Sequence, residues 1–279
     1  MKIWLRSRSA DSELLTWVRK IVSYLTENGV EVLVDPILGH FLRLESMSES
    51  EAYKADFAVI IGGDGTLLRT VQKSGGRLPP IVGFTTNSVG YLLLHNVADY
   101  ESVFTQLFNG NYELEDVQLG EFESKELRAV FLNEVAVWAH TGKLIELEVA
   151  VGGEKLYHLR ADGVIVSTPA GSTGHALSYG APVVTALGIP VLEVVFVGAL
   201  SPLIRPLITY NTPIEIQVMT WPSMLVVDGH VTLSLEYSSM LVVKPSGKTL
   251  RFVSVKGYRR KFSDRLRYRL LDRGLSSIL

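Results

Sequence analysis

The feature that most constrains the fold is a glycine-rich turn, Gly62-Gly63-Asp64-Gly65-Thr66, which directly follows the apolar run 57–61. An uninterrupted apolar run of this length is typical of a strand buried on both faces of a parallel sheet. Glycines then allow the backbone to turn sharply, and a helical pattern over 66–73 leads to another apolar run at 81–84. This order predicts a βαβ unit.

A similar alternation comes before this unit. Residues 2–5 and 30–34 are predicted as strands, and they flank a helical pattern over 12–27. Residues 36–54 are weakly patterned and rich in serine and glutamate, so we expect a surface segment there. Residues 1–114 are therefore predicted to form a Rossmann-like parallel α/β domain.

Beyond residue 115 the pattern changes to short runs rich in Val, Ile, Leu and Phe, which are typical of strands separated by turns. These runs are 129–138, 145–151, 163–167, 192–197, 214–218, 224–227, 231–235, 240–243 and 251–255. We expect residues 115–258 to form a mostly-β domain of the β-sandwich type. Residues 259–279 carry Phe262, Leu266 and Leu270 at four-residue spacing, which predicts a C-terminal amphipathic helix packed on the body.

Composition excludes several classes of function. The net charge is −2, so no global electrostatic attraction to nucleic acid or to an anionic membrane is expected. Without cysteine, the chain has neither a disulfide framework nor a thiol nucleophile. The longest apolar region, 181–200, is broken by Pro182, Pro190 and Glu193, and the N-terminus lacks the apolar stretch of a secretion signal. We expect a cytoplasmic protein with no membrane segment.

Asp64 is an unusual residue for a phosphate-binding turn and indicates that the turn takes part in a reaction. Backbone amides at the start of a helix bind phosphate well, whereas a carboxylate repels phosphate unless it accepts a proton or holds a metal. A structural turn with an aspartate that starts the helix is the alternative. Gly63 and Gly65 lack the third glycine of a dinucleotide fingerprint, and Gly247-Lys248-Thr249 lacks the earlier glycine of a P-loop.

Two further motifs contain polar residues in unusual settings. The segment from Arg160 to Ser178 leads from a strand into small residues and hydroxyls, then a helix, and it predicts a binding cradle for phosphate, ribose or carboxamide groups. A serine hydrolase is disfavoured because residues 171–174 lack the spacing of a nucleophile elbow. Asn133-Glu134 interrupts the apolar strand 129–138, and burying such a pair without polar partners is costly.

Taken in this order, the Gly62–Thr66 turn, the Asn133-Glu134 pair and the segment from Asp162 to Ser178 resemble the NAD kinase family. The resemblance extends from Ala58 through Arg205-Pro206 to residues 228–230. It implies that the chain phosphorylates the 2′-hydroxyl of the adenosine ribose of NAD to make NADP, with ATP and Mg²⁺ as the donor. It also implies homodimers or homotetramers.

The resemblance also implies roles for individual residues. Asp64 would be the general base that takes the proton from the 2′-hydroxyl. Gly62, Gly63, Gly65, Thr66 and Arg69 would line the phosphates, and Asn133 and Glu134 would hold the adenosine portion. The positions that match other dinucleotide contacts are Arg160, Asp162, Thr173, Gly174, His175, Ala176, Leu177, Ser178 and His230.

Three positions depart from the family pattern. Thr85 stands where the family has asparagine, His175 where it has tyrosine, and His230 where it often has glutamine. The two histidines are either ordinary polar replacements or, when protonated, phosphate contacts. The second interpretation predicts tighter NADP binding below about pH 6.5 than above it.

The remaining histidines, His40, His95, His140 and His158, show no metal-ligand spacing, so no fixed metal site is predicted. A basic cluster near the C-terminus is either a solvated helix face or an anion contact across a subunit interface. Its members are Lys256, Arg259, Arg260, Lys261, Arg265, Arg267, Arg269 and Arg273.

Two other functions compete with the NAD kinase interpretation. A lipid kinase of the diacylglycerol or sphingosine type would share the Gly-Gly-Asp-Gly-Thr turn but not the other two motifs. A non-catalytic dinucleotide sensor would share the cradle, but it would gain nothing from a carboxylate at position 64.

Overall fold

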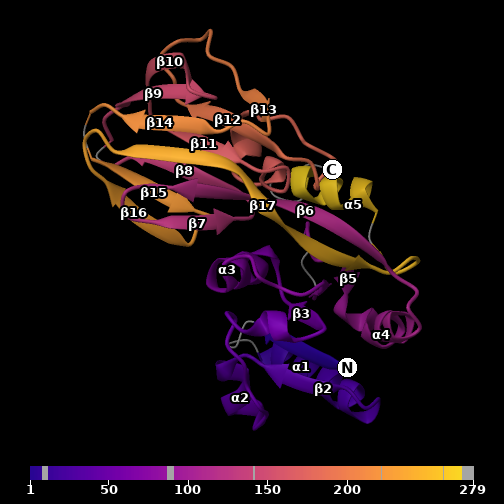
Figure 1. Cartoon of the computed structure of the whole chain (residues 1–279). Helices are drawn as coiled ribbons and strands as arrows, with labels where there is room; N and C mark the ends of the chain where they lie inside the picture. Colours follow the sequence, from indigo (N-terminus) through magenta and orange to yellow (C-terminus); the bar gives the residue numbers. More distant parts are fainter. Residues whose placement is uncertain (8–11, 87–90, 141, 221, 260, 272–279) are drawn as a thin grey trace. The chain divides into compact units, whose positions relative to one another are not determined.

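The computed structural model describes residues 1–7, 12–86, 91–140, 142–220, 222–259 and 261–271 (Figure 1). The chain divides into two compact units. Unit 1 comprises Met1–Asp116 and Leu250–Leu279, and unit 2 comprises Val117–Thr249. Both ends of the chain therefore belong to unit 1.

Unit 1 is built on a parallel sheet. Its strands are β1 (Lys2–Ser7), β2 (Glu31–Val34), β3 (Phe57–Ile61), β4 (Ile81–Thr85) and the short β5 (His95–Asn96). The order is β2-β1-β3-β4, and β5 and the end of the long strand β17 (Met240–Ser254) also pair with β4. The last four residues of β3 are fully buried, which confirms the strand predicted from its apolar run.

Helices accompany this sheet in the alternation that the sequence predicts. They are α1 (Ser12–Glu27), α2 (Pro36–Leu42), α3 (Asp64–Ser74), α4 (Tyr100–Phe108) and α5 (Phe262–Leu271), with 3₁₀ turns η1 (Ala52–Lys54) and η2 (Val97–Asp99). Val18, Ile21 and Leu25 of α1 pack into the same core as the strands, as expected for an amphipathic helix.

Helix α2 corrects the expectation of an irregular surface segment over 36–54. Asp35 caps this helix, because its carboxylate accepts from the backbone N–H groups of Ile37 (3.0 Å) and Leu38 (3.2 Å), and Pro36 occupies the first helical position. Leu38 is fully buried. The Asp-Pro start signal was therefore present in the sequence, but the serine-rich surroundings concealed it.

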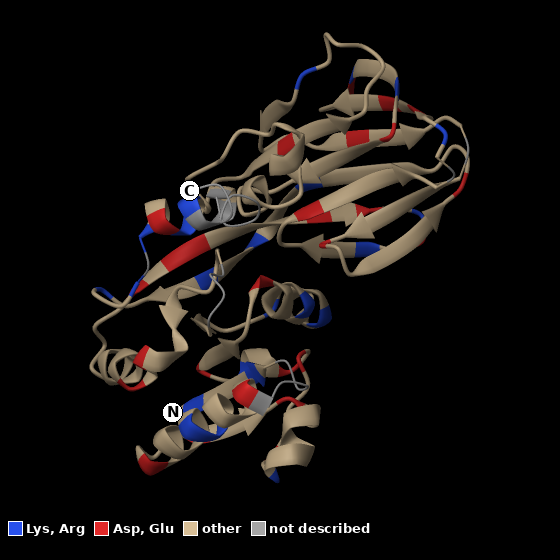
Figure 2. Ribbon diagram, turned by 180° about the vertical axis from the view of Figure 1, so that it is seen from behind, with Lys and Arg blue, Asp and Glu red and all other residues tan. Residues whose placement is uncertain are grey.

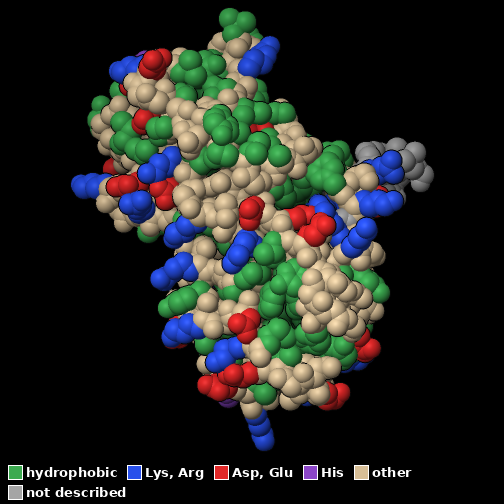
Figure 3. Space-filling view, turned by 45° about the vertical axis from the view of Figure 1, so that its right-hand side comes forward, with side chains coloured by type: hydrophobic (Ala, Val, Ile, Leu, Met, Phe, Trp, Pro, Cys, Tyr) green, Lys and Arg blue, Asp and Glu red, His purple; other side chains and the backbone are tan. Residues whose placement is uncertain are grey.

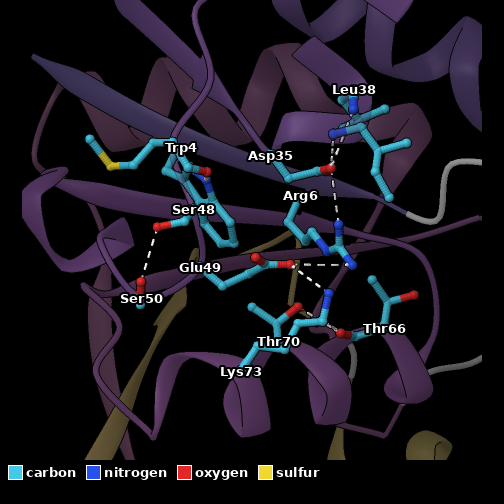
Figure 4. A network of polar contacts seen from close by, with 12 residues as sticks. Trp4, Arg6, Asp35, Leu38, Ser48, Glu49, Ser50, Thr66, Thr70 and Lys73 are labelled. Atoms are coloured by element: carbon cyan, nitrogen blue, oxygen red, sulfur yellow. Dashed lines mark hydrogen bonds and ion pairs between the residues drawn. The ribbon is translucent and has the colours of Figure 1, made fainter. Parts of the chain in front are cut away.

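A buried polar network ties α2 and α3 to the end of β1 (Figure 4). Arg6 on β1 contacts the fully buried Asp35 (3.1 Å) and also Glu49 (3.5 Å), and Lys73 on α3 contacts Glu49 (3.3 Å). Two carboxylates taken out of water need such cationic partners. Through the half-exposed Lys73, the network also contacts the last turn of α3, the helix that begins at Asp64.

Unit 2 is a sandwich of two largely antiparallel sheets, seen as layered strands in Figure 1. One sheet has the order β10-β9-β14-β17, with β6 and β7 joined to it, and the other has the order β13-β12-β11-β8-β15-β16. The strands are β6 (Glu113–Glu123), β7 (Arg128–Phe131), β8 (Glu134–Ala139), β9 (Ile145–Val151), β10 (Glu154–Ala161), β11 (Gly163–Ser167), β12 (Val191–Val197), β13 (Leu207–Tyr210), β14 (Ile214–Val218), β15 (Ser223–Val227) and β16 (Val231–Leu235).

The core of unit 2 lies between these sheets. Val135, Val137, Val164 and Val166 from one sheet pack with Leu147 and other residues of the second sheet in a single buried cluster. The predicted β-sandwich type of the second half is confirmed.

Charge is distributed over both units without a dominant sign. Lys and Arg residues are interspersed with Asp and Glu residues along the chain, and the face in Figure 3 shows the same mixture among hydrophobic side chains (Figures 2 and 3). In the part of the chain that the structure describes, no helix is long and apolar enough to cross a membrane.

Candidate active site

The glycine turn of unit 1 links β3 to α3. Gly62 has φ of +149°, and a Cβ at this position would lie 2.7 Å from Thr66 Oγ1, so the turn requires glycine. Its N–H donates to the Phe84 carbonyl (2.9 Å), which anchors the turn to β4. Gly63 is the N-cap of α3, and Gly65 is exposed in the first turn. The turn therefore presents a helix N-terminus, which suits an anion.

Asp64 is the first residue of α3 and is half-buried. Its Oδ2 accepts from the Tyr91 backbone N–H (3.0 Å), and its Oδ1 accepts from the Leu92 backbone N–H (3.3 Å). Because both oxygens are held, the carboxylate has one orientation. A fixed orientation is what a carboxylate needs in order to meet a substrate in a defined geometry.

The segment that holds Asp64 is itself held by helix α5. Arg265 donates to the Tyr91 carbonyl (2.7 Å), and its guanidinium lies 5.3 Å from the centre of the Tyr91 ring. Burial lowers the pKa of Arg265, and the charge of Asp64 is among the interactions that act in the opposite direction. At 2% exposure, Arg265 is an exception to the solvated interpretation of the C-terminal basic cluster. The exposed members of this cluster include Lys256, Arg259, Lys261 and Arg267.

Helix α5 is amphipathic, but its apolar contact face is shorter than predicted. Phe262 packs edge-on against Tyr91 at 6.3 Å, and Leu266 is half-buried, whereas Leu270 is 50% exposed. Among the other basic residues, Arg259 pairs with Glu115. Arg260 and Arg273 lie outside the described residues.

The Asn133-Glu134 pair lies at a switch between the two sheets of unit 2, which corrects the prediction of one continuous strand over 129–138. Strand β7 ends at Phe131 in one sheet, and β8 begins at Glu134 in the other. Asp228 holds the bend, because its carboxylate accepts from the backbone N–H groups of Leu132 (2.9 Å), Asn133 (2.7 Å) and Glu134 (3.1 Å). Asp228 belongs to the segment 228–230 of the family resemblance, which implies no role for this residue.

The predicted cradle folds directly onto this switch. Thr168 donates its hydroxyl to the Leu132 carbonyl (2.5 Å) and its N–H to the Asn133 carbonyl (2.9 Å). A Cβ at Gly171 would overlap the Asn133 carbonyl, and a Cβ at Gly174 would lie 2.9 Å from Glu134 Oε2. The structure therefore brings Asn133, Glu134 and the cradle together.

The cradle continues along the face of β11 as 3₁₀ turns rather than the expected helix. These are η3 (Gly171–Thr173) and η4 (Ala176–Tyr179). Thr173 and Ala176 are buried, Leu177 is half-buried, and Ser178 is exposed. The closely spaced glycines Gly171 and Gly174, together with the Thr168-Pro169 pair, disfavour a regular helix here.

An aromatic cluster marks the far end of this face. His175 is exposed, and its ring lies 5.3 Å from Trp138 and 5.3 Å from Tyr179. Trp138 pairs in register with Gly163, at the opposite end of β11 from Ser167. The cradle thus spans the length of β11, roughly 15 Å at the usual rise per residue.

The other predicted contact residues of unit 2 are more dispersed. Asp162 precedes β11 near Trp138, and its carboxylate lies against Gly198. His230 is exposed in the turn that follows Asp228. Arg160 is exposed on β10 and lines a hollow of about 390 Å³ with Glu146, His158 and Leu200, among other residues.

In unit 1, Arg69 is exposed on α3, and Thr85 is fully buried at the end of β4. Across the described part of the chain, no three His, Cys, Asp or Glu side chains form a group that could hold a metal ion.

Comparison with known proteins shows which family both parts of the chain match. The model of the ATP-NAD kinase N-terminal domain matches residues 5–112, and that of the ATP-NAD kinase C-terminal domain matches residues 132–255. An NAD kinase from Thermococcus kodakarensis is 32% identical over 91% of this chain and 94% of its own length. An NAD kinase from Methanothermobacter thermautotrophicus is 29% identical over 100% of this chain and 99% of its own.

Solved structures show the same fold. An NAD kinase from Archaeoglobus fulgidus in complex with ATP superposes with a TM-score of 0.78 at 25% identity, over 96% of this chain and 99% of that one. Yeast NADH kinase complexed with NADH gives a TM-score of 0.89 at 21% identity, over 100% and 89% of the two chains. From the domain models and the curated relatives, the chain belongs to the NAD kinase family.

Proposed function

We propose that Asp64 is the general base in the transfer of a phosphoryl group from ATP to the 2′-hydroxyl of the adenosine ribose of NAD. As a member of the NAD kinase family, the chain is a phosphotransferase with NAD and ATP as substrates. The observation that carries the proposal is the orientation of the Asp64 carboxylate by two backbone N–H groups beside a helix N-terminus.

The reaction requires one proton acceptor, and the Asp64 carboxylate can fill that role. The 2′-oxygen forms a bond to the γ-phosphorus as the bond from that phosphorus to the bridging oxygen breaks, and ADP leaves. The proton of the hydroxyl passes to Asp64. Because the transition state of phosphoryl transfer is loose, the base acts late and positioning supplies most of the rate enhancement.

The phosphates of the substrates would meet the N-terminus of α3. Gly62 and Gly63 shape the turn, and Thr66 closes it by donating its N–H to the Gly63 carbonyl (2.9 Å). Gly65 is exposed in the first turn of the helix, and Arg69 adds a positive charge on its exposed face. A helix dipole and a guanidinium both favour phosphate. Mg²⁺ entering with ATP would neutralise phosphate charge.

The dinucleotide would lie on the cradle of unit 2. Asn133 and Glu134 would hold the adenosine at one end, the residues from Thr173 to Ser178 would line its path, and Asp162 and Arg160 would hold the remainder. His230, beside the bend at Asp228, would add a contact at the adenosine end. The length of the cradle along β11 and its aromatic far end suit an extended ligand with two bases.

The setting of this activity is also proposed. The family resemblance favours a cytoplasmic enzyme that assembles as a homodimer or homotetramer. Gel filtration with light scattering would give the number of subunits, and a monomer at micromolar concentration would contradict this proposal.

Substitution of Asp64 tests the proposed base. Asp64→Asn retains the size of the side chain and removes the proton acceptor, so kcat should fall by roughly 10² or more while NAD affinity changes little. Asp116→Asn, an exposed position on β6, is the matched control and should retain full turnover. Unchanged kcat in Asp64→Asn would remove the residue from the mechanism.

A further inference from the structure

Glu193 is a fully buried carboxyl group in an otherwise apolar strand. It lies in β12, between Leu192 and Val194, and is 0% exposed. Its Oε2 accepts a hydrogen bond from the Ser167 hydroxyl (3.0 Å), whereas its Oε1 is buried and has no hydrogen-bond partner among the described residues. A buried, half-satisfied carboxyl is unfavourable to folding, so its presence calls for a reason.

The register of the sheet places this carboxyl beneath the cradle. Ser167 on β11 is paired with Glu134 on one side and with Glu193 on the other. Directly paired residues of antiparallel strands point to the same face, so the three side chains form a row across the sheet. Val195 lies on the same face and packs with Ala176 of the cradle.

The pKa of the Glu193 carboxyl lies close to neutral pH. Burial raises the pKa of the Glu193 carboxyl to about 7, and the hydrogen bond from Ser167 offsets only part of that rise. Of the charged or titratable groups on the described elements packed against it, Glu134 shares its row. His175 and Tyr179 belong to the aromatic cluster at the other end of the cradle. On β13 its register partner is the uncharged Ile208, and Tyr210 is exposed.

We propose that Glu193 is a positioning residue of the dinucleotide cradle and takes up a proton when the anionic dinucleotide binds. The inference rests on the proposed function, which places NAD on this cradle. The protonated carboxyl adds no charge to the row that it shares with Glu134, at whose far end the Asp228 carboxylate accepts from the Glu134 N–H. The ionised carboxyl adds a second negative charge to this row, about 10 Å from that of Glu134, two strand spacings away.

In the low-dielectric interior of the protein, that second charge would repel the pyrophosphate of the bound dinucleotide. At an effective dielectric constant of about 20, like charges about 12–25 Å apart repel enough to weaken binding by roughly three- to tenfold. NAD affinity should therefore fall by that factor between pH 6 and pH 8. By linkage, NAD binding must raise the proton affinity of Glu193.

Titration calorimetry with NAD, in two buffers of different ionisation enthalpy, measures this proton directly. NAD is the better probe because it lacks the 2′-phosphate of NADP, which itself titrates in this range. The wild-type protein should take up roughly 0.4 proton at pH 7, and Glu193→Gln should take up none. The matched control Glu236→Gln, at an exposed position, should behave as wild type.

A second variant guards against misfolding of Glu193→Gln. Ser167→Ala removes the hydrogen bond that favours the ionised carboxyl, so the midpoint of the affinity profile should move to higher pH. Equal proton uptake by wild type and Glu193→Gln, or an unmoved midpoint in Ser167→Ala, would overturn the inference while NAD still binds. Absence of NAD binding to the wild type at any pH would instead overturn the proposed function.

Discussion

At the scale of single residues, close backbone approach decides the geometry of the proposed dinucleotide site. The Asn133 carbonyl accepts from Thr168 and lies against Gly171, so the cradle and the Asn133-Glu134 pair form one packed unit. The Asp228 carboxylate fixes the bend from the other side, because it accepts hydrogen bonds from three backbone N–H groups. The polar pair at this bend is therefore positioned by backbone contacts on both sides.

Gly171→Ala tests this close packing. The added Cβ overlaps the Asn133 carbonyl, which the cradle holds in place, so the backbone must shift. We expect NAD affinity to fall at least tenfold, with a loss of unfolding free energy of about 1–3 kcal/mol. Calorimetry and urea unfolding measure the two effects. The control Gly247→Ala, where a Cβ meets nothing within 4 Å, should change neither, and equal behaviour of the two variants would refute the packing argument.

At the scale of elements, helix α5 is connected to the Asp64 carboxylate through a chain of contacts. Arg265 holds the Tyr91 carbonyl, and the Tyr91 and Leu92 amides hold Asp64. The helix was predicted from its periodicity, but the burial of Arg265 was not, because charged residues are assumed to face solvent. A hydrogen bond between residues 174 positions apart leaves no local pattern in a sequence.

Arg265→Met should lower kcat more than it raises the KM for NAD. Methionine fills part of the buried volume but cannot donate to the Tyr91 carbonyl, so the segment that orients Asp64 loosens. We expect a five- to fiftyfold loss of kcat, in line with small misplacements at active sites. The exposed Arg267→Met is the control. A selective rise in KM with normal kcat would place Arg265 in substrate binding instead.

At the scale of the whole molecule, the two units respond to pH in opposite directions. Burial lowers the pKa of His95 in unit 1 to about 4, although its hydrogen bond with the Gly83 carbonyl acts against this. Between that value and about 6.5 the unfolded chain binds a proton that folded unit 1 excludes, so stability falls as pH falls. Glu193 in unit 2 has a raised pKa of about 7, so stability falls as pH rises from about 4.5 to 7.

These two contributions, each ~3 kcal/mol, largely cancel in the wild type. Glu193→Gln removes only the second, so its unfolding free energy should rise between pH 5 and pH 7 by roughly 2 kcal/mol more than that of the wild type. Urea unfolding at the two pH values gives both slopes. Identical slopes would show that Glu193 does not hold its proton in the folded protein.

Much of this architecture was predictable from sequence. The buried strand 57–61, the glycine turn and the β-sandwich type follow from patterns of period two, period 3.6 and continuous apolar runs. The passage of the chain from one sheet to the other at Asn133 could not be predicted, because an apolar run that bends between two sheets has the same composition as one long strand. Asp228 and Glu193 act through neighbours on other strands, which only the register reveals.

The central claim is that an oriented Asp64 accepts the proton of the 2′-hydroxyl as NAD is phosphorylated. The most direct measurement is a rapid-quench single turnover with saturating NAD, ATP and Mg²⁺, comparing the wild type and Asp64→Asn. We predict that the wild type forms NADP and ADP in equal amounts and that the variant, with NAD still bound, forms NADP at least 10² times more slowly. NADP formation at the same rate in both would contradict the account.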